Sequence, residues 1–135
     1  MLSNGWYWIG STDYKFSSSG AMVGAWVDVP CYLQYPELPT GCESVALTNL
    51  LNYYGFGLGK TIIADYYLPK GSNGNFVTAF DGNPRRSSGG LMGCVAPAIT
   101  IAGNNFLRAA GSGKQAKDVS FSSISSIKNL SLIHI

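Results

Sequence analysis

The chain has 135 residues, of which 46% are hydrophobic and 12% charged, and its 9 basic and 7 acidic side chains leave a formal net charge of +2. This length and apolar content suffice for the core of one small domain. The weak charge predicts no nucleic-acid partner, and the lack of a long apolar run predicts no membrane segment in this chain.

The first 28 residues are rich in aromatic residues and glycine and form a candidate unit of their own. Aromatic runs at 4–10 and 19–27 predict a β-hairpin of two strands, with residues 13–16 as an insertion. This unit, residues 1–28, resembles one cell-wall-binding repeat of the choline- or glucan-binding type. The resemblance implies an exported protein, extracellular or on the cell wall of a Gram-positive bacterium. Since no signal peptide precedes the unit, we expect the true N-terminus to lie upstream.

Trp6, Trp8 and Trp26 are the candidate ligand-binding residues of this repeat. In repeats of this type, pairs of aromatic side chains enclose a quaternary ammonium group or stack on sugar rings, which makes choline or a wall glycan the implied ligand. The alternative is that the three indoles only pack the hairpin against the next domain. The sequence leaves both interpretations open.

A short strand at 27–33 and a helix at about 40–54 are predicted next. Thr40 and Glu43 have the T-x-x-E spacing of a capping box, which makes Cys42 the second helical residue. There the unpaired backbone N–H groups and the positive end of the helix dipole favour a thiolate over a thiol. Cys42 is therefore a candidate nucleophile.

Gln34 lies upstream of Cys42 in a stretch interrupted by Pro36 and Pro39, so its side chain can fold back beside the start of the helix. Its amide can then donate to an oxyanion together with the backbone N–H of Cys42. These two residues predict acyl transfer through a thiol nucleophile with an oxyanion hole.

Several segments, in order along the chain, resemble the C thirty-nine-like (bacteriocin-processing-peptidase-like) branch of the papain-like cysteine peptidases. They are residues 29–34, 39–47, 51–55, 64–71, 80–85 and 93–97. The resemblance covers about residues 27–130 and implies that Cys42 is the nucleophile, Gln34 the oxyanion donor, and a peptide or protein the substrate. It implies an α+β fold: an incomplete papain-like fold, the helical half, preceded by the aromatic hairpin. Residues 29–135 are then the N-terminal part of the peptidase domain.

A cysteine peptidase also needs a histidine to accept the thiol proton and an Asp or Asn to orient it. The one histidine, His134, stands in a segment unlike the family continuation, so we expect it to be incidental and the chain to be the front part of a longer domain. The fragment is then inactive as given. The alternative is a non-catalytic cell-wall or peptide-binding module with a degenerate peptidase fold.

Further helices are predicted at 61–67, at 95–109 and, more weakly, at 121–130, with a Gly/Ser/Asn-rich loop from 71 to 93. Within this loop the pair Arg85-Arg86 either contacts a substrate carboxylate or is solvated.

The cysteines stand at positions 31, 42 and 94, a spacing that fits no zinc site, and we predict neither a metal nor another cofactor. Cys31 and Cys94 are either bridged or free.

Overall fold

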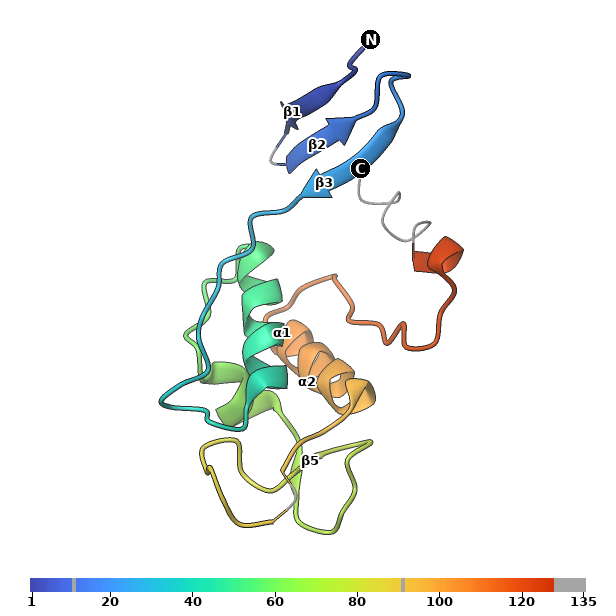
Figure 1. Cartoon of the computed structure of the whole chain (residues 1–135). Coiled ribbons are helices and arrows are strands. Elements are labelled where there is room, and N and C mark those ends of the chain that lie inside the picture. The colour runs from blue at the N-terminus through green and yellow to red at the C-terminus, as the bar shows by residue number, and fades with distance from the viewer. Residues whose placement is uncertain (11, 91, 128–135) are drawn as a thin grey trace.

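A computed structural model describes residues 1–10, 12–90 and 92–127. It combines an N-terminal antiparallel sheet with a helical body (Figure 1). The elements are β1 Gly5–Ile9, β2 Thr12–Phe16, β3 Met22–Trp26, α1 Cys42–Tyr53, η1 Ile63–Tyr67, β4 Lys70–Gly71, β5 Phe80–Asp81 and α2 Ala96–Ala109. This content is the α+β class that the sequence predicts, and it is compatible with part of a papain-like fold.

The N-terminal sheet has three strands in the order β1-β2-β3, all antiparallel. The predicted two-stranded hairpin is therefore wrong, since the supposed insertion at 13–16 is most of the central strand. Asp13 and Lys15 alternate with aromatic side chains, which is the period of a strand. Gly10 and Gly20, both with positive φ, stand in the connections on either side.

A long connection leads from β3 to α1 and runs beside α1 (Figure 1). The strand predicted at 27–33 is not formed there. The backbone N–H of Tyr32 donates instead to Oδ1 of Asn49, on α1, at 2.9 Å. A strand is stabilised by pairing with a neighbouring strand. This segment has a hydrogen bond to the side chain of Asn49 instead.

The helical body is built from α1, η1 and α2, which pack against one another around one apolar cluster. The predicted helices at 40–54 and 95–109 are confirmed by α1 and α2. The helix predicted at 61–67 forms as a π-helix over Ile63–Tyr67. The buried cluster comprises Leu47, Leu51, Ile63, Leu68, Phe80, Ala102, Phe106 and Leu107.

Two short parallel strands, β4 and β5, organise the predicted loop at 71–93. Asp81, at the end of β5, also bridges to Gly93, which returns the chain to the start of α2. The backbone N–H of Cys94 donates to the carboxylate of Glu43, so this segment lies next to the N-terminal end of α1. One helical turn at 124–127 follows, and the remainder of the helix predicted at 121–130, together with His134, lies outside the described residues.

Candidate active site

Cys42 is the first residue of α1, with Gly41 as the N-cap, and no side chain caps the helix. The capping box predicted from Thr40 and Glu43 is therefore wrong. Thr40 donates its hydroxyl to the backbone carbonyl of Arg86 at 3.0 Å, while the Glu43 carboxylate accepts the backbone N–H of Cys94 at 3.4 Å. Both side chains that match the capping pattern form hydrogen bonds with segments distant in sequence.

The loop around Pro84 fixes the position of the residues just before Cys42. The backbone N–H of Thr40 donates to the carbonyl of Pro84 at 3.3 Å. At Gly41 a Cβ would stand 2.9 Å from Cβ of Leu38 and 3.2 Å from Cβ of Pro84. The absence of a side chain at position 41 therefore permits the close contact that seats the start of α1.

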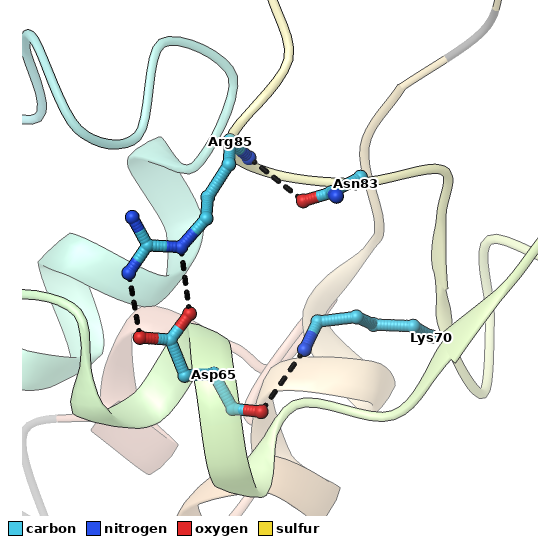
Figure 2. Close-up of polar contacts among 4 residues, drawn as sticks. All are labelled: Asp65, Lys70, Asn83 and Arg85. Atoms are coloured by element: carbon cyan, nitrogen blue, oxygen red, sulfur yellow. Dashed lines mark hydrogen bonds and ion pairs between the residues drawn. The ribbon is translucent and has the colours of Figure 1, made fainter.

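An ion pair holds this loop against η1 (Figure 2). The Arg85 guanidinium donates to both carboxylate oxygens of Asp65, at 2.9 and 2.7 Å, and lowers the pKa of that carboxyl group. The backbone N–H of Arg85 donates to Oδ1 of Asn83, and Lys70 donates to the backbone carbonyl of Asp65. Arg85 is thus paired with Asp65, an outcome that neither sequence interpretation of the Arg85-Arg86 pair contains.

The structure brings Gln34 and Cys42 to one open groove of about 530 Å³. The Gln34 amide donates to the carbonyl of Pro39 at 2.8 Å, which folds its side chain back toward the helix start. An amide nitrogen carries two hydrogens, so one N–H of Gln34 remains for another acceptor. The groove is lined by Tyr32, Leu33, Gln34, Tyr35, Cys42, Val45, Ala46 and Asn49.

The sulfur of Cys42 donates to a carboxylate oxygen of Glu43 at 3.2 Å. Burial of the sulfur and this Glu43 carboxylate raise the pKa of the thiol, although the residue as a whole is exposed. A negative charge beside a thiol opposes its ionisation. The prediction that the helix start lowers the pKa of Cys42 is therefore wrong for this arrangement, in which the pKa of the thiol is raised.

Cys31, Cys42 and Cys94 are all free. Cys94 packs against the apolar cluster, and burial, with smaller contributions from Glu43 and Cys42, raises its pKa to about 12. Of the two alternatives for Cys31 and Cys94, the structure shows the unbridged one. Over the described ranges, no group of three or more His, Cys, Asp or Glu side chains is arranged to hold a metal ion.

Trp6, Trp8 and Trp26 are 53%, 65% and 66% exposed, so their rings are not buried against a neighbouring domain. The strand register places Asp13 of β2 opposite both Trp8 and Trp26. Trp6, Asp13 and Trp26 line a shallow hollow of about 330 Å³. The sequence interpretation missed Asp13, although its alternation with aromatic residues is the signal of a strand.

The model of the Peptidase_C39 like family matches residues 26–131. The chain belongs to the Peptidase_C39 like family. Comparisons with curated proteins and with solved structures return no match. Membership in the Peptidase_C39 like family indicates a peptidase-related function for the helical body, whereas the strands β1 and β2 lie outside the matched residues.

A histidine base and an Asp or Asn that orients it also belong to the chemistry of a cysteine peptidase. The chain holds one histidine, His134, and it lies outside the described residues. The candidate site in the described residues consists of Cys42, Gln34 and the backbone N–H groups at the start of α1.

No helix in the described part of the chain combines the length and the apolar content that crossing a bilayer requires.

Proposed function

We propose that this Peptidase_C39 like domain cleaves peptide or amide bonds by acyl transfer, with Cys42 as the nucleophile and Gln34 as the oxyanion donor. The observation that carries the proposal is that both side chains line one groove at the start of α1. A peptide or protein substrate in this groove would present its carbonyl carbon to the sulfur of Cys42.

In the proposed reaction the sulfur of Cys42 attacks the carbonyl carbon, and the electron pair of the C=O bond moves to oxygen. The free N–H of Gln34 and the backbone N–H of Cys42 stabilise that oxyanion. Collapse of the intermediate expels the amine and leaves a thioester on Cys42, which water then hydrolyses.

The thiol proton requires an acceptor, and we assign this role to a histidine other than His134, the one histidine of this chain. A positioned acid–base group typically contributes a factor of about 10²–10⁴ to the rate. We therefore expect the 135 residues by themselves to be inactive toward peptides. Acyl transfer to Cys42 from an activated ester remains measurable, because an activated leaving group departs without a general acid.

The test compares two reactions of Cys42 in the protein with Gln34→Ala. Acetylation by p-nitrophenyl acetate passes through an oxyanion, whereas alkylation by iodoacetamide does not. At about pH 9, near the ordinary pKa of a thiol, acetylation should fall by about 10²–10³-fold while alkylation stays unchanged. Peptide mapping by mass spectrometry assigns each product to Cys42.

Gln115→Ala is the matched control, because it removes the same side chain from a surface outside the groove. It should leave both reactions of Cys42 at the wild-type rate. Acetylation that survives Gln34→Ala, or a loss of both reactions together, would overturn the assignment of Gln34. If acetylation maps to a residue other than Cys42, the assignment of Cys42 as the nucleophile is overturned.

A second candidate function is a non-catalytic cell-wall or peptide-binding module with a degenerate peptidase fold. The raised pKa of the Cys42 thiol favours it, because a thiol is a poor nucleophile. The exposed indoles of Trp6, Trp8 and Trp26 would then bind wall glycan or choline, and we place the protein outside the cell or on the cell wall.

Retention on purified cell walls tests this second function. Joint replacement Trp6→Ala and Trp26→Ala should abolish retention, since both rings line the hollow beside Asp13. Tyr66→Ala is the matched control, because it removes another exposed aromatic ring from the helical body. Retention that survives the double replacement would refute a wall-binding sheet.

A further inference from the structure

The carboxylate of Glu43 contacts both Cys42 and Cys94. One carboxylate oxygen accepts a hydrogen bond from the thiol of Cys42 at 3.2 Å, and the other accepts one from the backbone N–H of Cys94 at 3.4 Å. A Cβ at Gly93 would stand 3.5 Å from that second oxygen, so the carboxylate lies directly against the 93–94 backbone. The position of Glu43 is thereby fixed from two sides.

The groups that face Cys42 come from three parts of the chain. Glu43 lies beside it on α1, Cys94 approaches from the segment after β5, and Tyr32 and Tyr35 line the same groove. Among these groups Glu43 is the carboxylate.

Neither ion pair in the described part of the chain involves Glu43. The two pairs join Lys60 to Glu37 and Arg85 to Asp65. The Glu43 carboxylate therefore acts on the Cys42 thiol without a compensating ion pair in the described residues.

We propose that Glu43 is a positioning residue that holds Cys42 in the resting protein as a hydrogen-bonded thiol, and that loss of its charge releases the thiolate. The inference rests on the proposed function, in which Cys42 is the nucleophile. On release the thiol proton passes to solvent or to the general base. A cationic group placed against Glu43 would have the same effect as removal of its charge.

The experiment measures the rate at which iodoacetamide alkylates Cys42, between about pH 6 and pH 11, a range that spans the ordinary thiol pKa. Glu43→Gln keeps an oxygen for the Cys94 N–H and removes the charge. Because a neighbouring like charge shifts a pKa by about one unit or more, the midpoint of the profile should fall by about one pH unit.

Well below the midpoint, that shift increases the thiolate fraction about tenfold. Lower basicity also weakens the thiolate as a nucleophile, with a Brønsted slope of about 0.4–0.5, so the net rate should rise about threefold. The alkylation rate of Cys31, measured in the same samples, should not change. The matched control is Glu37→Gln, which removes another carboxylate of the same region and should leave the Cys42 midpoint in place.

A Cys42 midpoint that stays or rises in Glu43→Gln, with Cys31 unaffected, overturns the proposal. If that variant does not fold, the salt dependence of the wild-type protein decides: screening at about 1 M salt should lower the midpoint, and no change or a rise overturns the proposal. The midpoint in Glu43→Gln and its salt dependence in the wild-type protein both report ionisation of the Cys42 thiol. Neither depends on the acetylation that tests Gln34. Failure here is therefore distinguishable from failure of the proposed function.

Discussion

Replacement of Gly41 by alanine tests whether the start of α1 is as closely packed as the structure shows. The backbone at Gly41, with φ −101° and ψ 29°, is accessible to alanine, so the cost is steric and not conformational. The added Cβ would stand 2.9 Å from Cβ of Leu38, 3.2 Å from Cβ of Pro84 and 3.2 Å from Oγ of Ser44. Leu38, Pro84 and Ser44 are all fully buried, so none can move aside freely.

Overpacking of this kind costs about 1–3 kcal/mol, and we expect Gly41→Ala to lower the free energy of unfolding by that amount. Urea denaturation followed by far-UV circular dichroism measures the change, provided that the slope of the transition is the same in both proteins.

Gly113→Ala is the matched control for Gly41→Ala. It places the same methyl group in open space, at a backbone angle outside the left-handed region, and should change the stability by less than about 1 kcal/mol. If Gly41→Ala unfolds at the same urea concentration as the wild-type protein, the close approach of Leu38 and Pro84 to the helix start is refuted.

Three further predictions concern the core, an ion pair and a partly buried thiol. Phe80→Ala should cost about 3–5 kcal/mol in the same urea assay, because Phe80 is fully buried in the apolar cluster, and a smaller loss would contradict that packing. Arg85 lowers the pKa of Asp65 in the folded protein, so the pair stabilises the fold above the ordinary pKa of an aspartate, and this contribution is lost as the pH falls through the folded value. Thermal unfolding should therefore show a steeper loss of stability on acidification in the wild-type protein than in Asp65→Asn, and parallel curves would refute the pair. At about pH 8 maleimide should label Cys31 and Cys42 but spare Cys94, whose pKa is raised to about 12, until urea exposes it, and equal labelling of all three in the folded protein would contradict its burial.

The helical body could be predicted from the sequence because its signals are local. Apolar residues recur at helical spacing in α1 and α2, as in the pairs Leu47/Leu51 and Ala102/Phe106, and these positions are buried as expected. The groove that joins Gln34 to Cys42 could also be anticipated, since Pro36 and Pro39 turn the chain between them.

The errors arose where partners distant in sequence determine the structure. Thr40 and Glu43 match a local capping pattern, yet their hydrogen bonds go to Arg86 and Cys94. A spacing rule cannot register such partners, because it considers only residues within one helical turn. The central strand β2 differs from the prediction for another reason. Residues 13–16 lie between two aromatic runs and match an insertion, although the strict alternation of Asp13 and Lys15 with aromatic residues is the strand signal.

The segment Pro39-Thr40-Gly41-Cys42-Glu43 therefore carries information of a different kind from helix capping. Thr40 attaches the segment to the loop at 84–86, Gly41 leaves room for Leu38 and Pro84, and Glu43 attaches it to the 93–94 backbone. These contacts hold Cys42 in its position, and the carboxylate of Glu43 also opposes ionisation of the Cys42 thiol. A degenerate binding module would need the same packing, so the presence of this motif fits a peptidase and a binding module equally well. The difference lies with Gln34, because an oxyanion donor alters acetylation of Cys42 without altering its alkylation, whereas packing alters both.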